Sequence, residues 1–260
     1  MASLGFGTRR LRYGPGAHQV GELLRPDGPS RGVVVVLHGG FWRAHRTLEM
    51  TAPAAAELTR RGWDTWNVEY RRAGQGTWED TLADCAAAVD HVAALAESHG
   101  LDPGRVFLLG HSAGGHLAAW CAGRAAVAER AGHPPPAVRI RGVVTAGGVL
   151  DLVAGARAGT GDSAVAQFLG GPPDAVPARY ADADPTLRLP TGVPVRCVHS
   201  RADERVPFSQ SERYVTAAVA AGDDVRLLAA TGPHTGAIHV GSPDWDVVTA
   251  ALGELGQPHG

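Results

Sequence analysis

The chain has 260 residues with 44% hydrophobic and 19% charged side chains, and its formal net charge is −2. This length fits one α/β domain with a substantial core, residues 1–260, and the balanced charge indicates no nucleic-acid or membrane partner. No apolar run approaches the roughly 18 residues of a membrane span, and residues 1–16 contain arginines and glycines without an apolar stretch. Neither a secreted nor a membrane-spanning form is therefore expected. The three cysteines are expected to be buried thiols of a cytoplasmic protein: Cys85, Cys121 and Cys197.

The first strong structural signal is the apolar, β-branched run over 33–37, which predicts a strand buried on both faces of a sheet. A helical pattern follows over about 47–61, and the next strand is expected over 64–70. Between 78 and 96 the apolar residues recur every three to four positions, which predicts an amphipathic helix. The next apolar run, over 106–109, predicts a third strand.

That third strand runs into Gly110-His111-Ser112-Ala113-Gly114, a G-x-S-x-G motif followed by an Ala-rich helical pattern. A serine at such a strand-to-helix turn has a strained backbone, and its hydroxyl is exposed above the end of the strand. The two outer glycines allow the helix and the strand to approach closely. Ser112 is therefore the predicted nucleophile.

Strands are also predicted over 140–146, 194–199 and 225–229, with a helix over 209–221. Strands that alternate with helices predict an α/β fold with a doubly wound, mostly parallel sheet, whose ligands bind at the carboxyl ends of the strands. The Gly-, Pro- and Asp-rich segment over about 152–190 interrupts the alternation. It is expected to form short helices and loops, a small cap over the active edge. Its sequence contains no paired arginine cluster that would dictate an anionic ligand.

A serine hydroxyl needs a base within hydrogen-bond reach and an acid that orients the base. In this architecture the acid and then the base follow the serine in the chain, each on a loop after a strand. Asp203 follows the strand over 194–199, and His234 follows the strand over 225–229. Asp203 is therefore the predicted acid and His234 the predicted base.

Other residues compete for these roles. His239 is an alternative base, but it fits the start of the last helical region better. Asp151 and Asp184 are alternative acids, although Asp151 fits a helix or turn cap and Asp184, which precedes a proline, fits a turn. Three histidines lie near the site in sequence: His38, His111 and His116. Because their spacing matches no zinc site, neither a metal nor another cofactor is expected.

The negative oxygen of a tetrahedral intermediate needs preorganised N–H donors. The Ala113 amide begins the helix behind the serine, where the helix dipole adds partial positive charge. Glycines directly after the first buried strand, in His38-Gly39-Gly40-Phe41-Trp42, allow backbone amides to turn toward the same point.

These segments resemble esterases of the α/β-hydrolase fold and, among them, the kynurenine formamidase-like (arylformamidase) enzymes with an H-G-G-x-W motif. The likeness covers most of the chain and includes further segments: Glu69-Tyr70-Arg71-Arg72, Val206-Pro207 and Ser242-Pro243-Asp244-Trp245. It implies Ser112 as nucleophile, Asp203 as acid and His234 as base. It also implies three backbone amides as oxyanion donors: Gly39, Gly40 and Ala113. Two positions depart from the pattern, Ser200 in place of glycine and Thr235 in place of an aromatic residue, which leaves the pocket's shape open.

The expected function is hydrolysis of a small ester or formamide through an acyl-enzyme on Ser112. Phe41 and Trp42, together with Phe168 and Tyr180 from the cap, either form an aromatic wall for an aryl substrate such as N-formylkynurenine or pack in the core. An acyltransferase or cyclase would use the same acyl-enzyme. A non-catalytic ligand-binding module on the same scaffold is the third hypothesis. The oligomeric state is left open.

Overall fold

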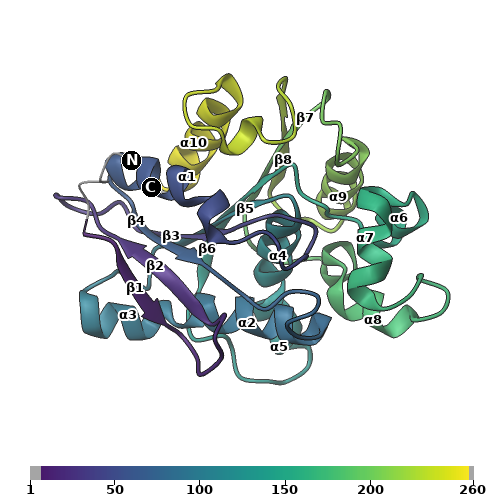
Figure 1. The fold of residues 1–260 in the computed structure, drawn as a ribbon, viewed down its shortest axis with the longest axis horizontal. Coiled ribbons are helices and arrows are strands. Elements are labelled where there is room, and N and C mark those ends of the chain that lie inside the picture. The colour runs from purple at the N-terminus through teal and green to yellow at the C-terminus, as the bar shows by residue number, and fades with distance from the viewer. Residues whose placement is uncertain (1–6, 258–260) are drawn as a thin grey trace.

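The computed structural model describes residues 7–257, and an eight-stranded sheet forms its centre (Figure 1). The strand order is β1-β2-β4-β3-β5-β6-β7-β8. The strands are β1 (Arg9–Arg12), β2 (Val20–Leu24), β3 (Val33–Leu37), β4 (Asp64–Val68), β5 (Val106–His111), β6 (Ile140–Ala146), β7 (Val195–Ser200) and β8 (Val225–Ala230). From β4 to β8 neighbouring strands are parallel, whereas β1 and β2 are antiparallel to their neighbours. The predicted doubly wound, mostly parallel sheet is confirmed.

Helices cover both faces of the sheet. On one face lie α1 (Ala52–Arg60) and α10 (Pro243–Leu255), and on the other α2 (Trp78–Asp90), α3 (Val92–His99), α4 (Ala113–Ala122) and α9 (Ser209–Ala220). The short α5 (Arg124–Arg130) follows α4. Side chains of β3 alternate between the two cores: Val33 and Val35 pack toward α2 and α4, and Val34 and Val36 toward α1. A strand buried on both faces is therefore apolar at every position.

Several boundaries differ from the predictions. The helical pattern over 47–61 is a 3₁₀ turn, η1 (Leu48–Met50), followed by α1, and the single helix expected over 78–96 is divided at His91 into α2 and α3. The two antiparallel strands at the start of the sheet were not predicted. β1 is a four-residue edge strand with three arginines, so it has little of the apolar pattern that marks a buried strand.

The cap segment contains α6 (Leu152–Arg157), α7 (Thr160–Leu169), α8 (Pro177–Ala183) and the 3₁₀ turn η2 (Pro185–Arg188). Its three helices lie on the same side of the molecule as α9 in Figure 1. Asp151 caps α6 by accepting the Ala154 N–H at 2.8 Å. Asp184 caps η2 by accepting the Thr186 N–H at 2.9 Å. Asp151 thus has the capping role that the sequence favoured for it, and Asp184 begins a turn, as its position before a proline indicated.

No helix in the described part of the chain has the length and hydropathy of a membrane span. The three cysteines are buried and unpaired, as expected from their apolar surroundings.

Candidate active site

Ser112 occupies the sharp turn between β5 and α4 that the motif predicts. Its backbone has φ 55° and ψ −118°, a conformation that is strained for a residue with a side chain. The Ser112 N–H donates to the Ala146 carbonyl at 2.9 Å, which ties the turn to the end of β6. Gly110 permits the close approach of strand and helix, because a Cβ there would lie 2.1 Å from the Gly114 carbonyl oxygen.

Asp203 and His234 come together although 30 residues separate them. The Nδ1 atom of His234 donates to Asp203 Oδ2 at 2.7 Å, and the other carboxylate oxygen accepts the backbone N–H groups of Arg205 (2.9 Å) and Val206 (2.8 Å). Burial raises the pKa of Asp203, but hydrogen bonds from His199, His234 and the Val206 amide outweigh it and hold this pKa well below its usual range. The ionised carboxylate therefore holds the imidazole in the tautomer whose Nε2 is an acceptor.

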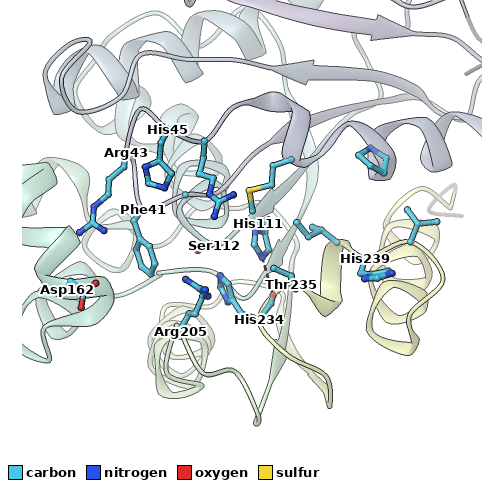
Figure 2. Close-up of a pocket in the computed structure, with 16 residues that line it drawn as sticks. Phe41, Arg43, His45, His111, Ser112, Asp162, Arg205, His234, Thr235 and His239 are labelled. Atoms are coloured by element: carbon cyan, nitrogen blue, oxygen red, sulfur yellow. Dashed lines mark hydrogen bonds between the residues drawn. The ribbon is translucent and has the colours of Figure 1, made fainter. Parts of the chain in front are cut away.

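One cavity of about 630 Å³ joins the serine to the histidine (Figure 2). Ser112, His111 and His234 line it together with residues of the loop after β3, the region around the start of α1, the cap and the loop after β8. Gly147, after β6, lies against the acid–base pair, since a Cβ there would be 3.1 Å from Asp203 Oδ2. In the described residues Ser112 and His234 are not hydrogen-bonded to each other, a common state of such pairs before substrate binds.

The loop after β3 lies directly against the serine turn. A Cβ on Gly39 would be 2.8 Å from the His111 carbonyl oxygen and 2.9 Å from Ser112 Cβ. The next three residues all have positive φ: 116° at Gly40, 52° at Phe41 and 54° at Trp42. Consecutive positive φ values curl the chain tightly, and the backbone of Gly39 lies directly against the serine turn.

Trp42 corrects one expectation, because it does not reach the cavity. Its ring is fully buried, stacks on Phe168 at 4.6 Å between centroids, and donates from Nε1 to His116 Nδ1 at 3.2 Å. Tyr180 is also buried. The indole finds an aromatic face and a hydrogen-bond acceptor inside the protein, so it packs between the loop and the cap. Phe41 is the aromatic residue of the expected wall that lines the cavity.

A buried ionic network beneath this loop was not predicted. Glu69 binds the His38 Nε2 at 3.0 Å and the Arg72 guanidinium at 2.9 Å, and it accepts the Leu48 N–H at 3.2 Å. Arg72 in turn donates to the Arg46 carbonyl oxygen. Burial raises the pKa of Glu69, yet the hydrogen bond from His38 and the charges of His38 and Arg72 lower it overall. The network anchors both ends of the loop that faces the serine; the only sequence signal for it was the Glu69-Tyr70-Arg71-Arg72 segment.

The residues of β3, the serine turn, the cap and the acid all fall within 25–217, the region that matches the family model BD-FAE. The chain belongs to the BD-FAE family. A stretch of 122 residues in this BD-FAE protein is 30% identical to Esterase LipQ of Mycobacterium tuberculosis, covering 44% of this chain and 28% of that relative. Another of 113 residues is 30% identical to the probable isoprenylcysteine alpha-carbonyl methylesterase ICME of Oryza sativa subsp. japonica, covering 43% and 27%. The aligned segments thus span little more than a quarter of these relatives' length.

Solved structures match the BD-FAE protein over almost its whole length. Esterase B of Lactobacillus Rhamnosis has a TM-score of 0.81 at 19% identity, covering 96% of this chain and 84% of that one. A truncated carbohydrate esterase from gut microbiota has a TM-score of 0.81 at 19% identity, covering 98% of both chains. A bacterial heroin esterase has a TM-score of 0.77 at 24% identity, covering 98% and 85%. At these identities the likeness shows the α/β-hydrolase fold.

The other histidines of this BD-FAE site have structural roles or lie apart from the acid. His111 Nε2 donates to the His234 carbonyl oxygen at 3.1 Å, and burial lowers the pKa of His111 to about 3, so its ring is neutral. His239 follows the 3₁₀ turn η3 (Gly236–Ile238) in the chain and lines the cavity. Asp203, however, is hydrogen-bonded to His234 and not to His239 among the described residues. Within 7–257, no three His, Cys, Asp or Glu side chains are grouped so as to hold a metal, and His38 and His116 bond to protein partners.

Proposed function

We propose that this protein is a carboxylic ester hydrolase with Ser112 as nucleophile, His234 as base and Asp203 as acid. The observation that carries the proposal is the 2.7 Å pair of His234 and Asp203 beside a serine with strained backbone, with Ser112 and His234 lining one cavity. The names of the curated relatives, an esterase and a methylesterase, support the same chemistry.

In the proposed mechanism Ser112 Oγ forms a bond to the ester carbonyl carbon while His234 Nε2 takes the hydroxyl proton. Backbone amides of Ala113, Gly39 and Gly40 hold the oxyanion. When the intermediate collapses, the alcohol leaves with the proton from His234. Water then attacks the acyl-enzyme with His234 again as base, and the carboxylic acid is released. Asp203 stays ionised throughout and stabilises the imidazolium.

Cleavage of an aryl formamide is proposed as a second reaction of the same site. A formamide carbonyl can pass through the same acyl-enzyme, with an amine in place of the alcohol as leaving group. Phe41 on the cavity wall offers a flat apolar face for an aryl ring, and Thr235, where an aromatic residue was expected, leaves more room beside the base.

Turnover of p-nitrophenyl acetate and of N-formylkynurenine by the purified protein tests the proposal. Ser112→Ala and Asp203→Asn should each lower kcat by about 10⁴-fold or more. Ser98→Ala, on the exposed end of α3, is the matched control and should change nothing. A fluorophosphonate probe should label Ser112. Product analysis with added amines and alcohols would reveal acyl transfer, and absence of both labelling and turnover would support a ligand-binding module instead.

A further inference from the structure

The cavity is lined by an excess of positive charge. Arg43, Arg46 and Arg205 line it, whereas Asp162 is the one carboxylate among its lining residues in the described chain. In the view of Figure 2, Arg43 and Asp162 lie beyond Phe41 from the serine, and Arg205 lies beside His234. The arginines come from the loops after β3 and β7, so the lack of an arginine pair in the cap sequence did not reveal them.

These three guanidinium groups differ in how far protein carboxylates neutralise them. Arg43 donates to two neutral oxygens, the Gly161 carbonyl and Gln167 Oε1, each at 3.1 Å. Arg205 lies 3.6 Å from Glu204, and both side chains are more than half exposed. Arg46 forms no ion pair with any carboxylate in residues 7–257. Arg43 likewise has no carboxylate partner there, but its guanidinium is bound by two neutral oxygens. In the same residues the Arg46 guanidinium donates no hydrogen bond, so of the three it is the most available to an anion.

Arg46 is also held in place by the architecture of the loop. Buried Arg72, paired with Glu69, donates to the Arg46 carbonyl oxygen. The Arg46 side chain lies across Gly40, where a Cβ would be 2.4 Å from Arg46 Cβ. Gly40 belongs to the loop that faces Ser112, and Arg46 lines the same cavity as Ser112. A guanidinium is a planar, permanently charged donor that matches a carboxylate with two parallel hydrogen bonds.

We infer that the preferred substrate is an anionic ester whose carboxylate binds Arg46 while its ester carbonyl lies at Ser112. This inference rests on the proposed function and adds the chemical class of the substrate. The carboxylate belongs either to the acyl half or to the alcohol half of the ester, and the two halves are separable by experiment. Arg43 and Arg205 add to the positive potential that draws the anion into the cavity.

Matched ester pairs test the inference with the full chain. For the acyl half, mono-p-nitrophenyl glutarate is compared with its methyl ester; for the alcohol half, p-acetoxybenzoate is compared with methyl p-acetoxybenzoate. In at least one pair the anion should have about tenfold higher kcat/KM at low salt, the size expected of a charge-assisted hydrogen bond. This ratio should fall as salt is added.

Arginine variants locate the effect. Arg46→Gln should reduce the anion-to-neutral ratio about tenfold, and Arg46→Lys should restore part of it. Because the result is a ratio within one variant, a general loss of activity does not affect it. Arg226→Gln, at the opposite end of β8, is the matched control and should keep the wild-type ratio. Thermal unfolding of each variant checks that it is folded.

The two proposals fail in different ways. If the neutral esters are hydrolysed in a Ser112-dependent manner but neither anion is preferred, the inference is overturned and the proposed function stands. A preference that survives Arg46→Gln also overturns the assignment to Arg46. If no ester of either charge is turned over and Ser112 is not labelled, the proposed function itself is wrong.

Discussion

Gly39→Ala adds a single methyl group at the point where the loop after β3 touches the serine turn. Built on the present backbone, that carbon would lie 2.8 Å from the His111 carbonyl oxygen and 2.9 Å from both His111 Nδ1 and Ser112 Cβ. All three distances are shorter than real Cβ atoms show, and none of these atoms is the end of a flexible side chain. Gly39 does not have a positive φ, so the strain comes from space and not from backbone preference. The loop or the turn must therefore move.

Two quantities should change. Overpacking of this kind costs about 1–3 kcal/mol of unfolding free energy. A displaced loop also misplaces the amides proposed to hold the oxyanion, and loss of one such donor lowers kcat by about 10²–10³-fold. Steady-state turnover of p-nitrophenyl acetate gives kcat, and urea unfolding followed by tryptophan fluorescence gives the stability.

Gly28→Ala is the matched control, because no heavy atom lies within 4 Å of a Cβ there. It should keep kcat and change the unfolding free energy by no more than about 0.5 kcal/mol. A folded Gly39→Ala protein with kcat within about twofold of the wild type would refute the argument, since the loop would then be able to move without consequence for the oxyanion.

Two further predictions concern stability. Glu69→Gln removes the carboxylate from a buried ion pair and should lower the free energy of unfolding, measured in urea, by about 3–5 kcal/mol. Glu57→Gln is the control, because the arginine partners of Glu57 are solvent-exposed, and it should lower that free energy by less than about 1 kcal/mol. Equal losses of stability in the two variants would contradict the role of the buried network. Burial lowers the pKa of His111 to about 3 and of His116 to about 4, so below about pH 6.5 the unfolded chain takes up protons that the folded chain does not. The free energy of unfolding should therefore fall from pH 7 to pH 5, by up to about 1.4 kcal/mol per pH unit for each histidine. A free energy of unfolding that does not change over this pH range would show that these rings are not buried in neutral form.

Local patterns in the sequence were sufficient for most of the sheet. The run over 33–37 and the motif around Ser112 predicted β3 and the turn after β5, because a buried strand and a strand-to-helix turn each impose residue types on a few consecutive positions. The cap formed by Asp151 and the turn at Asp184 were predictable for the same reason. The edge strand β1 was not, since an edge strand carries a weak apolar pattern. Its neighbour β2 was also missed, because Gly21 and Glu22 interrupt its short apolar run.

The positions of the side chains around the site depend on contacts between segments that lie far apart in the chain. Trp42 was expected at the cavity, but its ring stacks on Phe168 of the cap and is buried in the core. Likewise, the role of Glu69 in the buried network depends on its pairing with His38 and Arg72. Arginines from separate loops meet around one cavity. Residue type and spacing specify the elements, while the direction in which each side chain points depends on what the fold places opposite it.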